Sequence, residues 1–173
     1  MHCKYKLIFP SLFVLLMVCS LSCGYRFAGS GNLPEGVQKV SVAIFKNNTA
    51  ETGLENTFTN DLIYEFIRSG RTVLPDQENA DAVISGTVRS IGVASAARSD
   101  SSSSTERRVT ITADIKLTAK DGRVIWTAKG ISEDQTFIVE SDKQATEENK
   151  NDAIEYVSKR LAEFVIRRMT DNF

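Results

Sequence analysis

The 173-residue sequence has very few of the residues that most often bind metals or carry out acid–base catalysis. Its single histidine is His2, and its three cysteines are Cys3, Cys19 and Cys23. If the first 22 residues are removed, no histidine remains for a catalytic triad, a histidine metal site or a general base. Much enzyme chemistry is thereby removed.

The carboxylates Glu147, Glu148 and Asp152 on the last helix leave a paired-carboxylate role open, but acidic residues are common in the first turns of helices. We therefore predict that the protein is not an enzyme and has no metal site and no cofactor.

The sequence also lacks an excess of charge of either sign, because its net charge is −1. A protein that binds nucleic acid usually carries a clear basic excess, so we expect no nucleic-acid partner. Hydrophobic residues make up 42% of the chain, which argues against disorder throughout. The length is that of one domain.

The N-terminus has the layout of a bacterial secretory signal peptide. Lys4 and Lys6 precede an apolar run from Leu7 to Val18, and small residues follow that run. The run is too short to cross roughly 30 Å of hydrocarbon comfortably, which disfavours a transmembrane anchor.

The segment Ser20-Leu21-Ser22-Cys23 resembles a lipobox, in which the cysteine becomes the lipidated N-terminus. We predict a lipoprotein signal peptide over residues 1–22, and a tether over 23–36 that is anchored by acyl chains such as palmitate on Cys23. Several acyl chains together anchor a protein stably. Gly24 stands where Asp would resemble an inner-membrane retention signal, so we expect an outer-membrane location.

A first strand and a first helix follow the tether. Alternating apolar residues predict a strand over 37–45. Thr52 and Glu55 fit a capping box at the start of a helix over 53–69. Gly70 is the expected C-terminal stop of that helix.

The rest of the chain contains mostly strands before a closing helix. Residues 71–74 form a short extended piece, and residues 98–105 form a polar loop rich in serine. Asp121-Gly122 marks a hairpin turn, and Trp126 is expected in the core or at a protein interface. The remaining predicted elements are strands over 82–93, 107–118 and 123–130, and a helix over 143–170. A continuation of the last strand to about 139 is the alternative.

The fold class predicted from this order is α+β. We expect residues 37–173 to form one two-layer sandwich, in which two helices pack on one face of a mostly antiparallel four-stranded sheet, in the order β-α-β-β-β-α. The first strand–helix–strand unit should cross over right-handed, with its strands parallel or nearly so. The other sheet face carries Thr110, Thr112, Asp114 and Lys116, and should be solvated or meet a polar partner.

Basic residues lie at both ends of the predicted hairpin. Arg107 and Arg108 stand beside the serine loop, whereas Lys120 and Arg123 flank the Asp121-Gly122 turn. Either pair could hold an anionic headgroup through charge-assisted hydrogen bonds. Alternatively, these side chains keep strand ends and edges soluble.

The segment Cys23-Gly24-Tyr25-Arg26-Phe27 resembles the Cys-Gly-Tyr-x-Phe opening of the LptE family, the lipopolysaccharide-assembly lipoproteins of Gram-negative outer membranes. Two further segments, Val40–Thr49 and Ala80–Gly86, are similar to that family's first strand and turn and its second-strand entry. The closing helix also agrees, so the resemblance covers nearly all of the chain after residue 22.

The resemblance implies a non-enzymatic outer-membrane lipoprotein with two helices on a four-stranded sheet. Such a protein plugs the large β-barrel LptD, assists its assembly, and forms with it the translocon that inserts lipopolysaccharide into the outer leaflet. It would be lipid-anchored and face the periplasm or lie within the barrel lumen. The candidate lipopolysaccharide-binding residues are Arg107, Arg108, Lys120 and Arg123.

Two other hypotheses remain open. The strand, turn and helix pattern is also similar to the periplasmic domains of TolB-like and curli-secretion lipoproteins, which bind envelope partners or assemble channels. A lipid-anchored hydrolase is disfavoured because Ser101–Ser104 lack a Gly-x-Ser-x-Gly elbow and no histidine follows residue 22.

Overall fold

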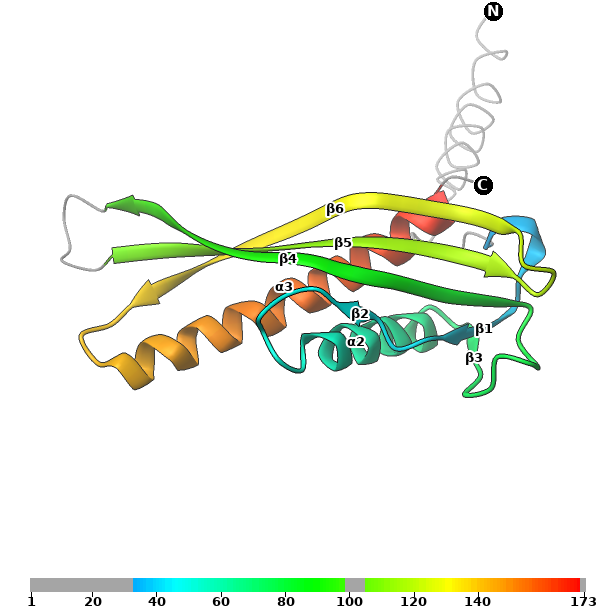
Figure 1. Cartoon of the computed structure of the whole chain (residues 1–173), viewed down its shortest axis with the longest axis horizontal. Helices are drawn as coiled ribbons and strands as arrows, with labels where there is room; N and C mark the ends of the chain where they lie inside the picture. The colour runs from blue at the N-terminus through cyan, green and yellow to red at the C-terminus, as the bar shows by residue number, and fades with distance from the viewer. Residues whose placement is uncertain (1–32, 99–104, 172–173) are drawn as a thin grey trace, which may run out of the picture. The chain divides into compact units, whose positions relative to one another are not determined.

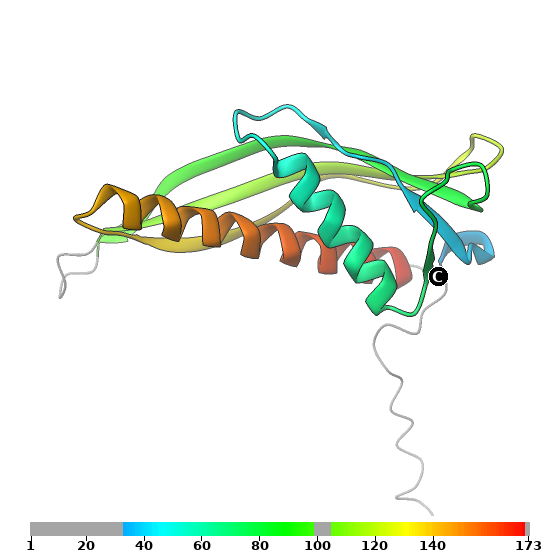
Figure 2. The same cartoon turned by 90° about the horizontal axis from the view of Figure 1, so that it is seen from below.

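The computed structural model describes residues 33–98 and 105–171. In this part of the chain, two helices lie on the same face of one mixed sheet (Figure 1). Figure 2 shows both helices from the side that they cover. The elements are η2 (Pro34–Gly36), β1 (Lys39–Val42), β2 (Lys46–Asn47), α2 (Leu54–Arg68), β3 (Thr72–Val73), β4 (Ala82–Arg98), β5 (Thr105–Ala119), β6 (Val124–Val139) and α3 (Lys143–Asp171).

The sheet has the strand order β3-β1-β4-β5-β6, and the short β2 also pairs with β4. β1 runs parallel to both β3 and β4, whereas β4, β5 and β6 form an antiparallel meander. The predicted α+β class, the parallel first unit and the meander are confirmed. The predicted four-stranded sheet is wrong, because the described sheet has six strands and is mixed.

The extra strands arise because the predicted strand over 37–45 is interrupted. The Phe45 side chain is buried against β4 at Gly86 and meets the Phe58 ring edge-on, with ring centroids 4.9 Å apart. The Phe45 N–H donates to Thr59 Oγ1 of α2 (3.2 Å) rather than to a strand. The chain therefore pairs with β4 twice, as β1 and again as β2. The extended piece predicted over 71–74 supplies β3, which pairs with β1.

The start of α2 differs from the predicted capping box. The helix begins at Leu54 after Gly53, whose φ of 89° favours glycine, and no side chain caps it. Glu55 instead accepts a hydrogen bond from Asn47 Nδ2 (2.7 Å). Its own backbone N–H and the Asn47 amide lower the pKa of the Glu55 carboxyl. The same Asn47 amide donates to the Glu51 carbonyl (2.8 Å), so a turn side chain organises the entry to the helix.

The core lies between the sheet and the two helices. Trp126 is only 8% exposed, so the core prediction for this residue is confirmed. Each large apolar side chain that is buried in this way contributes roughly 1.5–3 kcal/mol. The alternating inner face of β5 is buried, and so is one apolar stripe on each helix: Val109, Ile111, Ala113, Ile115, Leu117, Leu54, Phe58, Leu62, Phe66, Val157, Leu161, Val165 and Met169.

Asp81 joins the first strand to the meander. Its carboxylate accepts the N–H groups of Gln38 (3.1 Å) and Lys39 (2.8 Å), which lower the pKa of this group. Its backbone carbonyl accepts the N–H of Lys120 in the β5–β6 turn (3.0 Å). Asp81 therefore connects β1, β4 and the turn, which gives the Ala80–Gly86 segment a structural role.

Packed residues begin before Val37. Leu33 is 1% exposed and Pro34 is also buried, although both fall in the predicted tether over 23–36. Cys23, the signal-peptide region 1–22 and most of the serine loop lie outside the described residues. Within the described ranges, neither helix is long and apolar enough to cross a membrane.

Candidate functional site

The β5–β6 hairpin carries the predicted basic residues at its two ends. We call the end with Arg107 and Arg108 the distal end, and the end with Lys120 and Arg123 the proximal end. The two ends are separated by about 40 Å, since a strand rises 3.4 Å per residue. The predicted separation into two groups of cations is confirmed by the pairing of β5 with β6.

At the proximal end, Arg123 is held by two carboxylates. Its guanidinium donates to both oxygens of Glu35 (3.1 and 3.0 Å) and to Asp121 Oδ2 (2.9 Å). These contacts raise the pKa of Arg123, and Arg123 in turn lowers the pKa of Asp121 through its backbone N–H and its side chain. Arg123 therefore ties the turn to the η2 segment and has its charge offset locally.

Lys120 is the other cation of the proximal end. Its side chain is exposed, and no ion pair links it to another described residue. Its charge helps to lower the pKa of Asp81, after the two backbone N–H groups that this carboxylate accepts. Lys120 is thus available to bind an anion, although the carboxylate of Asp81 lies nearby.

At the distal end, Arg107 and Arg108 point to opposite faces of the sheet, because successive residues of a strand alternate. Arg107 lies opposite the buried Phe137 and so belongs to the inner, helix-covered face. Arg108 lies on the outer face, with its Nε 3.2 Å from Asp134 Oδ2. The prediction of one joint basic cluster here is therefore wrong.

Arg107 differs from the other two arginines in its surroundings. No described residue forms an ion pair with it. On the same inner face, Val93 pairs with Val109 and is 45% exposed, since α3 packs mainly along β6. An exposed guanidinium beside exposed apolar surface matches the chemistry of an amphiphile with an anionic headgroup.

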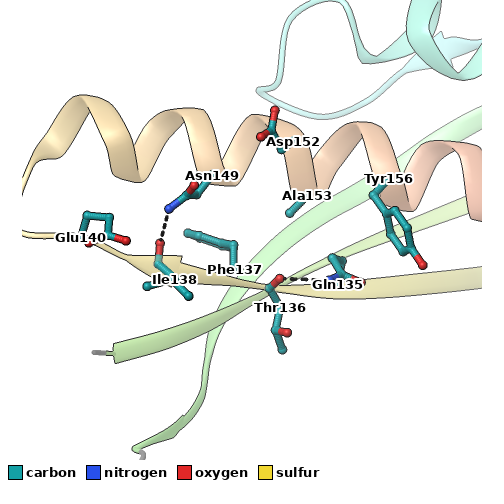
Figure 3. A pocket seen from close by; sticks show the side chains of 9 residues that line it. All are labelled: Gln135, Thr136, Phe137, Ile138, Glu140, Asn149, Asp152, Ala153 and Tyr156. Atoms are coloured by element: carbon teal, nitrogen blue, oxygen red, sulfur yellow. Dashed lines mark hydrogen bonds between the residues drawn. The ribbon is translucent and has the colours of Figure 1, made fainter. Parts of the chain in front are cut away.

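A hollow of about 390 Å³ lies beside the distal part of β6 and was not predicted (Figure 3). Phe137 and Ile138 of β6 and Asn149 and Tyr156 of α3 are among its lining residues. In the sequence, this hollow is indicated only by three polar residues at helical spacing, Asn149, Asp152 and Tyr156. They lie on one face of α3 beside its apolar stripe.

The outer sheet face is polar, as predicted. Thr110, Thr112 and Asp114 are half-buried and Lys116 is exposed. Asp114 accepts the Gly130 N–H (2.7 Å) and lies 3.5 Å from an Arg89 nitrogen. Both helices lie on the opposite face (Figure 2). The described residues hold no group of three or more potential metal ligands.

The family model for LptE, described as lipopolysaccharide-assembly, matches residues 37–169. The chain belongs to the LptE family. This match confirms the resemblance read from the sequence and gives this LptE-family lipoprotein a role in lipopolysaccharide assembly. No curated protein matches the chain.

Solved lipoprotein structures share the LptE-family fold seen here. Lipoprotein B from Nitrosomonas europaea is 14% identical, with a TM-score of 0.56, over 86% of this chain and 92% of that one. Rare lipoprotein B from Shewanella oneidensis is 8% identical, with a TM-score of 0.53, over 78% and 95%. A minor lipoprotein from Acinetobacter baumannii is 14% identical, with a TM-score of 0.52, over 78% and 92%. Identities this low show the fold alone.

Proposed function

We propose that this LptE-family protein is an outer-membrane lipoprotein, anchored through Cys23, that plugs and helps to assemble the β-barrel LptD. Together the two proteins would form the translocon that inserts lipopolysaccharide into the outer leaflet. The observation that carries this proposal is the family match over residues 37–169. The role is one of binding and assembly, without catalysis.

The polar outer face supports a location inside a barrel. A water-filled lumen requires a plug with a polar surface, and this face is lined with threonines and ion pairs rather than apolar side chains. β4 alone, with 17 residues, extends over about 50 Å. Only one of the largest outer-membrane barrels could therefore enclose the domain even in part.

The distal end is the better candidate for contact with lipopolysaccharide. Arg107 has an exposed charge with no described ion-pair partner, next to exposed apolar surface. Arg108 must break its ion pair with Asp134 before it can bind a phosphate group. Lys120 can contribute one positive charge. Arg123 must break its ion pairs with Glu35 and Asp121 before it can bind a phosphate. We therefore expect the contribution to binding to fall in that order.

Purification of the tagged protein from native outer membranes in mild detergent tests the proposal. We expect a large β-barrel protein to co-purify in stoichiometric amount, as identified by mass spectrometry. Recovery of a homo-oligomer, or of soluble periplasmic partners only, would favour the TolB-like or curli-secretion-like alternative.

The Cys23→Ala variant is the matched test of the anchor. In cells without the barrel partner, the variant should move from the membrane to the soluble fraction, while its melting temperature stays that of the folded domain. Continued membrane attachment in those cells would contradict lipidation at Cys23.

A further inference from the structure

β6 is the last strand of the sheet, and no described strand pairs with its outer edge. Its residues 131–139 pair with β5 without a register shift, whereas the irregularity near Gly130 is confined to the other half. An edge of this length presents a row of backbone N–H and C=O groups that can pair with another chain. The regular half of β6 is therefore open to a further strand.

α3 runs beside this edge in the opposite direction. Asn149 of α3 contacts Ile138 of β6, and Arg160 of α3 lies 3.6 Å from Glu133 of β6. The distance between these contacts is about 17 Å along the helix and about 17 Å along the strand. Helix and strand therefore stay side by side over this length, as Figure 3 shows for its distal part.

Two hollows between β6 and α3 follow this edge. The first is the hollow of about 390 Å³ described above, and the second has about 240 Å³ and includes Glu133 and Arg160. Tyr156 lines both hollows, so the two adjoin at this side chain and together follow the strand edge beside α3. We call this the β6–α3 groove.

Side-chain amides occupy part of the edge in this groove. Asn149 Nδ2 donates to the Ile138 carbonyl (3.0 Å), and Gln135 Nε2 donates to the Thr136 carbonyl (3.2 Å) (Figure 3). Thr136 and Ile138 are two residues apart, so their backbone groups point to the same side of the strand, and the Ile138 carbonyl meets α3 there. The amides donate where the N–H groups of a neighbouring strand would donate, and a strand that entered the groove could replace them.

The charges along the groove are graded from one end to the other. The distal hollow has two carboxylates, Glu140 and Asp152, and no cation among its lining residues. The proximal hollow has three cations and two carboxylates, which leaves a net positive charge there: Lys159, Arg160, Arg167, Glu133 and Glu163. The Arg160 guanidinium also lies 5.9 Å from the centre of the Tyr156 ring. The N-terminal end of a strand antiparallel to β6 would lie at the acidic distal end of the groove, and its C-terminal end would lie at the basic proximal end.

We propose that the β6–α3 groove binds an extended polypeptide segment of a partner protein by strand addition, antiparallel to β6. The segment has basic residues at its N-terminal end, acidic residues at its C-terminal end, and alternating polar and apolar residues between them. Main-chain hydrogen bonds would supply affinity, and the charge gradient would fix the direction. Arg107 does not line this groove, although it lies opposite Phe137, which does. The inference concerns a polypeptide partner and so goes beyond lipopolysaccharide binding.

The experiment uses the peptide acetyl-Lys-Lys-Thr-Val-Thr-Val-Thr-Val-Glu-Glu-amide and a control peptide with the Lys and Glu pairs exchanged. Fluorescence anisotropy should show the first peptide binding at least about tenfold more tightly than the second, since opposite charges would then meet along the groove. A third peptide with alternate amides N-methylated should lose binding, because it cannot donate to the edge.

Matched protein variants then test the position. The Arg160→Glu, Arg167→Glu double variant should remove or reverse the preference between the two charged peptides. Arg168→Glu, on the same helix but outside the groove lining, should leave the preference unchanged. Amide hydrogen exchange at Thr136 and Ile138 should slow when the first peptide is bound.

The proposal is overturned if both charged peptides bind equally, if the N-methylated peptide binds as tightly, or if the Arg168→Glu variant changes the preference as much as the double variant. Self-association of the protein through the same edge, detected by sedimentation and by slowed exchange without peptide, would also contradict it, since the occupant would then be a second copy.

Discussion

The two ends of the β5–β6 hairpin look alike in the sequence and differ in the folded protein. Each end has two basic residues. At the proximal end, Arg123 is bound by Glu35 and Asp121, and it serves to hold the structure together. At the distal end, Arg107 has no ion pair with a described residue and lies beside exposed apolar surface. A binding site for an anion thus depends on which cations lack carboxylate partners, and charge content alone does not reveal it.

Two glycines of β4 show a second contrast, between the two faces of the sheet. Near the proximal end, Gly86 lies directly under the Phe45 ring and close to the Asp114 carbonyl, which leaves no room for a side chain. Farther along the same strand, Gly92 has nothing within 4 Å of where a side chain would begin. Gly86 pairs with Ile115 and faces the packed inner side of the sheet, whereas Gly92 pairs with Thr110 and faces the open outer side.

The largest effect is expected from Gly86→Ala. The added methyl group would overlap the Phe45 ring and the Asp114 carbonyl, so the free energy of unfolding should fall by about 1–3 kcal/mol. Gly92→Ala is the control and should stay within about 0.5 kcal/mol of the parent. Chemical denaturation measures both, and equal losses would contradict the contrast between the packed inner face and the open outer face.

The next effect concerns the cations. Arg107→Ala should weaken the binding of purified lipopolysaccharide about tenfold, or about 1.4 kcal/mol, without lowering the melting temperature. Arg123→Ala should change that affinity less than about twofold, because Arg123 already has its charge offset. If Arg123→Ala proved the more damaging to binding, the proximal end would be the anion site.

Asp61 gives a smaller, pH-dependent effect in the helix layer. Its carboxylate accepts a hydrogen bond from the hydroxyl of the buried Ser158 across the α2–α3 contact (2.5 Å). Burial raises the pKa of Asp61. The charges of Glu155 and Glu65 add to this rise, whereas the Ser158 hydrogen bond and the charge of Lys159 oppose it. The fold therefore favours the neutral acid, so this contribution to stability is full below the ordinary pKa and is lost as pH rises through the folded pKa.

Asp61→Asn should remove this dependence, since a neutral amide oxygen can still accept from Ser158. We expect a small rise in melting temperature at pH 7 that disappears toward pH 4. A series of thermal melts between these values measures it, with Asn60→Asp as an exposed control on the same helix. A parallel offset at every pH would show that burial of the charge is not the cause.

The smallest effect is the loss of stability in Arg123→Ala. Its ion pairs are exposed, so the melting temperature should fall by at most about 2 °C. Adding salt to the parent protein should produce part of the same decrease. A fall as large as that of Gly86→Ala would mean that the η2 contact stabilises the domain far more than exposed ion pairs do.

Features set by local periodicity were predicted well from the sequence. The alternation in β5, the apolar stripes of α2 and α3 and the burial of Trp126 all follow from spacing within one element. The parallel first unit and the meander follow from element order. The family was also predicted correctly, from short segments spread along the chain.

Features set by contacts between distant residues were not predicted. Phe45 interrupts a strand because of Gly86 and Thr59, and Glu35 reaches Arg123 across 88 residues of sequence. The opposite orientations of Arg107 and Arg108 follow from strand alternation and could have been predicted. The β6–α3 groove could not, because it requires knowing which strand lies at the sheet edge and where the helix runs.

The most direct test of this contrast is photo-crosslinking in living cells with p-benzoylphenylalanine placed at position 107 or at position 123. The account predicts a lipopolysaccharide adduct from the Arg107→p-benzoylphenylalanine variant and little or none from the Arg123→p-benzoylphenylalanine variant. Equal adducts at the two positions, or an adduct at position 123 alone, would contradict the assignment of the distal end as the lipopolysaccharide-binding end.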